Sequence, residues 1–221
     1  MMSLDFMVLL FVAAWFVQMG AHEGAHAWVA YLRGDDTAYR LGKRTFNPLA
    51  HVNWKDINSI LMAVGLPIIT AMAGWIPMGM AWVPVNPRRF KSPSMDMALV
   101  SVAGPVANFV VVVACLLLHW VLPGAGDPNM IPAELVPRLL WFAHKGFFVV
   151  ALTSMLYGVF NLVPIPPLDG SKVLRFFLPE AGQDILDRLQ PYGMWMIIAV
   201  FWVGDASWIF TIPMAIIGLI W

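Results

Sequence analysis

Three long apolar stretches constrain the fold of this chain more than any other feature. They cover about residues 4–32, 94–122 and 136–163, and as helices each could cross the roughly 30 Å of hydrocarbon in a bilayer. The chain is 60% hydrophobic and only 12% charged, with a mean hydropathy of +0.75. A soluble domain carries about a quarter charged residues. The sequence therefore predicts an all-α polytopic membrane protein.

One membrane-embedded domain is expected over residues 1–221. The three apolar stretches would form its core, and residues 185–221 would add C-terminal helices that cross once or twice. The first stretch lacks the basic region of a secretory signal, which favours a retained span. The 13 basic and 13 acidic residues cancel, so no nucleic-acid partner is indicated. The only cysteine, Cys115, excludes an internal disulfide.

The distribution of basic residues predicts the orientation of the spans, because Lys and Arg concentrate in cytosolic loops. No Lys or Arg precedes Arg33, and the loop at 123–135 contains neither. The basic residues outside the spans gather instead near residues 33–55, 88–91 and 172–188. We therefore expect the corresponding ends of the three core helices to face the cytosol.

A fourth apolar stretch, residues 59–83, conflicts with a simple crossing. Basic residues flank it on both sides, so a full crossing would place one group outside. Pro67 and Pro77 interrupt it, and broken backbone is tolerated at membrane depth where protein covers it. We expect a re-entrant segment that dips in and returns to the cytosolic side. The alternative is an ordinary span that follows the charge rule weakly.

Two histidines and a glutamate lie together in the first span, in the sequence HEGAH. Positions i and i+4 share a helix face, so His22 and His26 could bind one zinc ion. Glu23 lies about 100° around the helix, close enough to reach a metal-bound water without being a ligand. A charge at the bilayer centre costs about 2.5–3.5 kcal/mol or more and usually marks function. A polar pair that fastens two helices is the alternative, but it would need only one such group.

A catalytic zinc site needs a third protein ligand and one open position. The orientation places His119 and His144 at the outer end, where we expect interfacial or helix-pairing roles. His51 lies in the cytosolic connection and could face the site, although we favour a structural role. Asp169 lies just beyond the 136–163 stretch, at the same end as HEGAH.

The sequence around Asp169, FNLVPIPPLDGSKVL, favours a carboxylate that points inward. Pro164, Pro166 and Pro167 exclude a regular helix there, so the chain can bend toward the histidines. Gly170 permits the tight backbone that follows. Asp169 is therefore the strongest candidate for the third ligand.

HEGAH in a first long span, followed much later by NLVPIPPLDG, resembles the site-2 protease family of intramembrane zinc metalloproteases. The stretches GDDTAYRLGKRTFNPLAH, VPVNPRRF, DMALVSVAGPVANF and QPYGMW resemble its small prokaryotic branch, which has no PDZ or CBS domain. The resemblance implies a three-helix catalytic core and one Zn²⁺ per chain, held by His22, His26 and Asp169. It also implies Glu23 as general base. The chain departs from its relatives at His51-Val52-Asn53-Trp54 and at Ser171, neither of which is a predicted ligand.

Two asparagines are further candidates. In the family the asparagine that corresponds to Asn108 is thought to position substrate or to stabilise the oxyanion, which an amide donor can do. The alternative is an interhelical hydrogen bond, worth about 0.6 kcal/mol in membranes. For Asn161 we favour a structural role, in which it fixes the broken backbone near Pro164.

The function implied is cleavage of transmembrane segments, in single-span membrane proteins, by zinc-activated water. A substrate helix must first unwind, and its exposed backbone could then pair with a strand edge. The alternating stretch from Tyr39 to Phe46 is our candidate for this edge, within a short β-element near residues 38–48.

Two other classes of protein would explain part of the pattern. A catalytically silent scaffold or chaperone of the same fold would be expected to lose Glu23 or a ligand. A zinc transporter or sensor would need His or acidic groups on both sides of the membrane, whereas here they cluster at one end. The resemblance implies an integral protein of a prokaryotic plasma membrane, and the basic residues predict an active site towards the cytosol.

Overall fold

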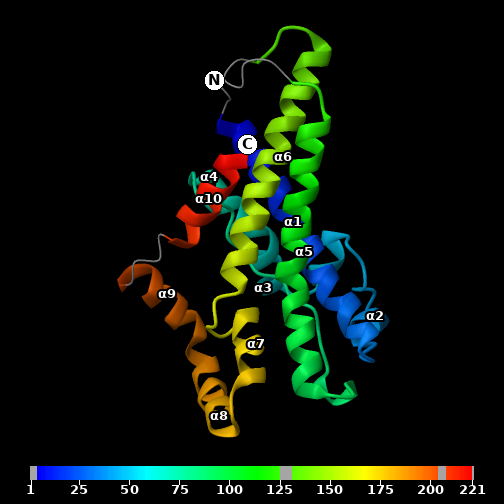
Figure 1. The fold of residues 1–221 in the computed structure, drawn as a ribbon, viewed down its shortest axis with the longest axis vertical. Coiled ribbons are helices and arrows are strands. Elements are labelled where there is room, and N and C mark those ends of the chain that lie inside the picture. Colours follow the sequence, from blue (N-terminus) through cyan, green and yellow to red (C-terminus); the bar gives the residue numbers. More distant parts are fainter. Residues whose placement is uncertain (1–3, 125–130, 204–207, 221) are drawn as a thin grey trace.

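Three long helices form the centre of the computed structural model, which describes residues 4–124, 131–203 and 208–220 (Figure 1). They are α1 (Leu4–Leu32), α5 (Pro93–Val121) and α6 (Leu135–Asn161), and each packs against the other two. Each is long and apolar enough to cross a membrane. The described residues form helices, turns and loops without a β-strand. The prediction of an all-α polytopic membrane protein is confirmed.

The ends of the core helices are arranged as the orientation argument requires. Helices α1 and α6 run in the same direction and α5 runs against them (Figure 1). Arg33, just after α1, binds Asp96 in the first turn of α5 through Nε at 2.6 Å. The second oxygen of Asp96 accepts the amide of Ser92 at 3.0 Å, so one buried carboxylate caps α5 and ties it to α1.

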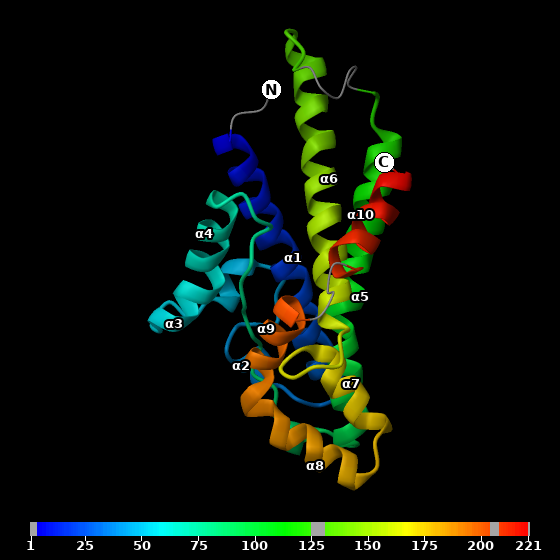
Figure 2. The ribbon, with the colours of Figure 1, turned by 90° about the vertical axis from the view of Figure 1, so that its left-hand side faces the viewer.

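The apolar segment after α1 enters and then turns back. It contains α3 (Ile57–Ile60), a π-helical turn (Leu61–Gly65) and α4 (Leu66–Met72). The chain reverses at Gly74, where φ is +80°, and returns without regular structure beside the helix (Figure 2). The Met80 amide donates to the Met62 carbonyl at 3.0 Å, and the Asn86 amide to Asp35 at 2.6 Å. Asp35 lies three residues after α1, so the returning chain comes back to the end of α1 from which it set out, as a re-entrant segment requires.

The broken backbone of this segment is paired by side chains of the core helices. Pro67 lacks the amide that would bond the Ala63 carbonyl, and the indole Nε1 of Trp15 donates to that carbonyl at 2.9 Å. The hydroxyl of Tyr157 donates to the Pro77 carbonyl at 2.5 Å. These bonds attach the re-entrant segment to α1 and α6, which meets the requirement for paired backbone in lipid.

The β-element expected near residues 38–48 is absent, and this part of the prediction was wrong. The chain forms α2 (Thr37–Arg40), then turns, and then a 3₁₀ helix at Pro48–His51. The alternating residues do not pair with a strand. The guanidinium of Arg44 instead lies 4.0–4.6 Å from the ring centroids of three aromatic residues, Trp28, Tyr31 and Tyr39.

The C-terminal part begins with α7 (Asp169–Phe177) and α8 (Glu180–Leu189) at the lower end in Figure 1. They are followed by α9 (Gly193–Val203) and by α10 (Trp208–Ile220), which packs against α6. The helices α9 and α10 are much shorter than the core helices, with 11 and 13 residues. A single domain over residues 1–221 stays a prediction.

The return of the re-entrant segment can be tested by cysteine labelling in a Cys115→Ala background. Leu41→Cys precedes the segment and Lys91→Cys follows it, and both positions are exposed. A membrane-impermeant maleimide should label both from the same side of sealed vesicles, whereas Gly124→Cys, beyond α5, should be labelled only from the other side. Labelling of positions 41 and 91 from opposite sides would show that the segment crosses.

Candidate metal centre

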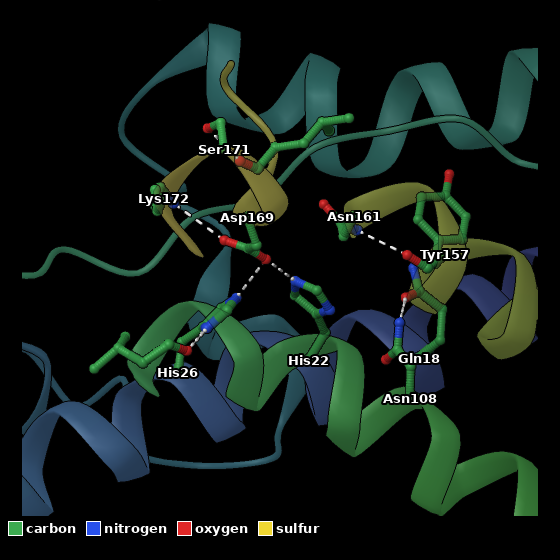
Figure 3. A network of polar contacts seen from close by, with 11 residues as sticks. Gln18, His22, His26, Asn108, Tyr157, Asn161, Asp169, Ser171 and Lys172 are labelled. Atoms are coloured by element: carbon green, nitrogen blue, oxygen red, sulfur yellow. Dashed lines mark hydrogen bonds and ion pairs between the residues drawn. The ribbon is translucent and has the colours of Figure 1, made fainter. Parts of the chain in front are cut away.

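Three buried side chains from distant parts of the chain meet between α1 and α7 (Figure 3). The Nε2 atoms of His22 and His26 each lie 3.1 Å from Oδ2 of Asp169. The two imidazoles stand edge to face with ring centroids 4.6 Å apart, as the i and i+4 spacing on one helix requires. The three predicted ligands thus present two nitrogens and one oxygen to one point.

A backbone carbonyl of α5 fixes the orientation of one of these rings. Nδ1 of His26 donates to the Val100 carbonyl at 2.6 Å. This hydrogen bond places the ring proton on Nδ1 and leaves the Nε2 lone pair facing Asp169, an arrangement common in metal sites. The Val100 carbonyl lies in a turn of α5 where Pro105 has no amide to donate to the Ser101 carbonyl. One backbone hydrogen bond of the helix is therefore missing beside the site.

Gly104 allows α5 to lie directly against the two imidazoles. A Cβ atom on this residue would stand 2.5 Å from Nε2 of His26 and 2.6 Å from Nε2 of His22. Both distances are well inside van der Waals contact, so any side chain here would displace the ligand atoms themselves. The space beside the two nitrogens therefore exists because position 104 has no side chain.

Asp169 reaches the histidines because the chain bends sharply after α6. Short turns follow that helix, in which the Ile165 amide donates to the Val163 carbonyl at 2.8 Å and the Leu168 amide to Ile165 at 2.9 Å. Asp169 is then the first residue of α7.

Glu23 lies beside the three ligands without joining them. It is buried, and it lines a cavity of about 470 Å³ that opens beside the histidines. The re-entrant segment forms one wall of this cavity from Met80 to Val85, and Asp169 and residues of α8 contribute to the other walls. The predicted ligands and the predicted base therefore line one cavity, which has room for a substrate.

The two candidate asparagines take different positions. Asn108 is fully buried between α1 and α5, where its Nδ2 donates to Oε1 of Gln18 at 3.4 Å (Figure 3). It does not contribute to the cavity wall, whereas Asn161 and Ser101 do. The Asn161 side chain donates from Nδ2 to the Tyr157 carbonyl at 3.0 Å, within the last turn of α6. Among the described residues, the backbone near Pro164 that we expected it to fix is not its partner.

The remaining histidines lie away from the three ligands. His51 is buried and its Nε2 donates to the Thr45 carbonyl at 2.9 Å, which agrees with a structural role. Burial lowers the pKa of this imidazole. His119 and His144 face each other near the far ends of α5 and α6, with their Nδ1 atoms 2.8 Å apart.

Sequence reasoning missed several residues of the cavity. The wall from Met80 to Val85 carries no catalytic side-chain type, so no motif could have marked it. Lys172, whose Nζ lies 3.1 Å from Oδ1 of Asp169, stands three residues after the ligand. That spacing places both side chains on one face of α7 and was the available signal.

The donor set and its surroundings fit a zinc ion. The three ligand atoms lie within 4.8 Å of one another, and two imidazoles with one carboxylate are a usual set for catalytic zinc. One histidine has the backbone hydrogen bond typical of a metal ligand, and position 104 leaves the ligand nitrogens uncovered. The cavity beside them provides an open side.

Replacement of Gly104 by alanine should lower zinc affinity, because the added methyl group would push against both ligand nitrogens. A loss of at least about tenfold is expected, comparable to the removal of a supporting residue in other metal sites. Gly146→Ala is the matched control, since a Cβ at this position in α6 meets nothing within 4 Å. Competition with a chromogenic chelator measures the affinity. Equal affinities for the two variants would contradict the packing described here.

The comparisons with known proteins agree with this site. The family model of "Peptidase family M50" matches residues 125–204, which include Asp169. "Putative zinc metalloprotease YwhC" of Bacillus subtilis is 31% identical over 185 residues, covering 84% of this chain and 76% of that protein. "Putative zinc metalloprotease Rip2" of Mycolicibacterium smegmatis is 30% identical over 210 residues, covering 92% of this chain and 71% of that protein. No solved structure matches. The chain belongs to peptidase family M50, the site-2 protease family of membrane zinc metalloproteases.

Proposed function

We propose that this protein is an intramembrane zinc endopeptidase that cleaves transmembrane segments of other membrane proteins. The observation that carries the proposal is the convergence of His22, His26 and Asp169 on one point beside a cavity that also contains Glu23. A membrane metalloprotease follows from the family, and the three side chains are the ligands that we assign to its zinc. Cleavage within the membrane is supported by the depth of the site in α1.

The depth follows from helix geometry. His26 lies six residues before Leu32, the last residue of α1, so it stands about 9 Å inside the end of the helix. The basic residues that follow α1 favour the cytosol at this end. We therefore propose a site just below the cytosolic surface of a prokaryotic plasma membrane, where water has a short path to it.

Each protein residue has a separate part in the proposed reaction. Zinc, when bound, supplies a Lewis acid that activates water for attack on a peptide carbonyl. Glu23 accepts the proton of the attacking water and passes it to the leaving amine. Its position in the cavity wall, outside the group of three ligands, leaves its carboxylate available for this transfer.

The returning part of the re-entrant segment is the surface on which we place the substrate. Three even-numbered residues of this chain form hydrogen bonds with the rest of the protein. The Met80 amide donates to the Met62 carbonyl, the Trp82 carbonyl accepts from Lys43 Nζ at 3.3 Å, and the Asn86 amide donates to Asp35. No hydrogen-bond partner within the described residues is found for the amides of three odd-numbered residues, Ala81, Val83 and Val85. In extended chain these amides share one edge.

An unwound substrate segment would pair with this edge. Exposed backbone needs partners in lipid, and strand addition supplies them regardless of side-chain identity. The edge borders the cavity that contains Glu23, so a paired substrate would lie beside the base. We therefore assign the edge that pairs with the substrate to residues 81–85, and not to residues 39–46, which the sequence suggested.

Two amides could stabilise the developing oxyanion. Asn161 already stands in the cavity wall, and one N–H of its amide is bonded to the Tyr157 carbonyl. Asn108 points to Gln18, so an oxyanion role for Asn108 requires its side chain to turn away from that partner. In this arrangement of the helices Asn161 is the better placed of the two, and Asn108 supports the contact between α1 and α5.

Zinc transport and a silent scaffold are less well supported. Among the described residues, one group of His, Cys, Asp and Glu side chains could hold a metal, and it lies at one end of the helix core. A transport path would need further ligands toward the other side. A silent scaffold would have no use for a glutamate buried beside the ligands, where an unneeded carboxylate is costly.

Substitution of Glu23 by glutamine should abolish cleavage of a single-span reporter and leave zinc binding intact, because Glu23 is not a ligand. A loss of at least about hundredfold is expected for a general base. Cleavage is measured in proteoliposomes and zinc content by mass spectrometry, with Glu134→Gln at the far end of the core as control. Zinc removal by a chelator should stop the reaction and added zinc should restore it. Equal cleavage by parent and Glu23→Gln would remove Glu23 from the mechanism, and an inactive parent would favour the scaffold.

Val83→Pro should weaken cleavage without loss of zinc, because proline removes an amide from the proposed substrate edge. One backbone hydrogen bond contributes about 0.5–1.5 kcal/mol, so kcat/KM should fall up to about tenfold. Val83→Ala keeps the amide and serves as the matched control. The same loss in both variants would assign the effect to the side chain and contradict strand addition.

A further inference from the structure

The two carboxylate oxygens of Asp169 have different surroundings (Figure 3). Oδ2 lies 3.1 Å from Nε2 of both His22 and His26. Oδ1 points the other way and accepts a hydrogen bond from Nζ of Lys172, also at 3.1 Å. The carboxylate is thus divided between a metal-facing oxygen and an oxygen already engaged by an ammonium group.

The pair is built into the first turn of α7. Asp169 and Lys172 are separated by three residues, which places their side chains on one face of the helix. The Asp169 side chain is only 7% exposed, whereas that of Lys172 is 46% exposed. The lysine therefore lines the cavity wall and reaches a buried carboxylate, while nearly half of its own side-chain surface stays exposed.

The other polar groups of α7 are directed elsewhere. Arg175 Nη1 binds Asp187 of α8 at 2.7 Å and the Gln183 carbonyl at 3.2 Å. The hydroxyl of Ser171 donates to the Leu168 carbonyl at 2.7 Å. Lys172 is thus the residue of this helix that engages the second oxygen of Asp169.

An engaged second oxygen matters for the chemistry of the site. A carboxylate with both oxygens free can bind a metal through one or through both. A catalytic zinc must keep one coordination position open for water or substrate. An ammonium group on Oδ1 leaves a single oxygen for the metal and fixes the plane of the carboxylate.

We propose that Lys172 is a positioning residue that holds Oδ1 of Asp169, so that the carboxylate presents only Oδ2 to the metal. Lys172 touches neither the metal nor the reacting atoms and acts through Asp169. This inference rests on the proposed assignment of Asp169 as a zinc ligand, and its test separates the two.

The test compares metal binding by the full-length protein in detergent. Lys172→Met keeps most of the side-chain volume and removes the ammonium, and should lower zinc affinity by about 10–100-fold, as loss of a supporting partner does in other sites. Lys172→Arg should stay close to the parent, because guanidinium can hold the same oxygen. Arg188→Met is the control for charge, since Arg188 is exposed on α8 outside the cavity wall.

Cobalt substitution gives a second readout that a general loss of stability would not produce. Four-coordinate Co²⁺ absorbs visible light more strongly than five-coordinate Co²⁺. The Lys172→Met protein should therefore show weaker absorption than the parent, because both oxygens of Asp169 become free to bind. Unchanged zinc affinity together with an unchanged cobalt spectrum would overturn the inference.

A double substitution locates the effect. In an Asp169→Asn background, Lys172→Met should cause no further loss of affinity, since its partner is already absent. A further loss there would show that Lys172 acts through something other than Asp169, and the inference would fail. If Asp169→Asn alone leaves zinc affinity unchanged, the ligand assignment fails instead.

Discussion

The metal centre depends on how closely α5 approaches α1. In lipid the hydrophobic effect does not drive helices together, so close packing of small residues and interhelical hydrogen bonds must stabilise their contact. Gly104 brings the backbone of α5 against the imidazoles, and Val100 uses the same proximity to bond His26. The ion pair between the partly exposed Arg33 and the buried Asp96 fixes the register of the two helices nearer their ends. The geometry of the two histidines is therefore set mainly by their neighbouring helix.

A second constraint is the pairing of broken backbone in a medium without water. Pro67 frees the Ala63 carbonyl, and the Pro77 carbonyl lies in irregular chain without a helical partner. Side chains from α1 and α6 bond these two groups. Within the part of the protein that the structure describes, hydrogen bonds hold the returning chain along one edge, and no partner is found for the amides of Ala81, Val83 and Val85 on the other. An unpaired edge is unfavourable unless water or another chain meets it, and here it borders the cavity that contains Glu23. The amides of this edge thus lie where we place the substrate.

Local patterns allowed the core of this structure to be predicted from the sequence, while contacts across the chain were harder to foresee. The spacing of His22 and His26 fixes a shared helix face, and the prolines before Asp169 marked the bend that turns it inward. The strand expected at residues 39–46 was wrong because Thr37–Arg40 forms a helix, and Arg44 packs among aromatic rings of α1 and α2 instead of beside a partner strand. The bonds that hold Met80, Trp82 and the Asn86 amide in place join them to residues 18 to 51 positions away, so no local pattern could reveal that wall. Asn108 and Asn161 share a residue type and differ only in the neighbours that packing gives them.

The separation between the ligands along the chain bears on when the enzyme becomes competent during its synthesis. His22 and Asp169 are 147 positions apart, with both other core helices between them. The first two imidazoles enter the bilayer early, but they acquire their carboxylate partner only after α6 has been inserted and the turn beyond it has emerged from the ribosome. A truncated or partly inserted chain therefore cannot assemble the proposed ligand set, so the proposed peptide hydrolysis would be withheld until membrane integration is nearly complete.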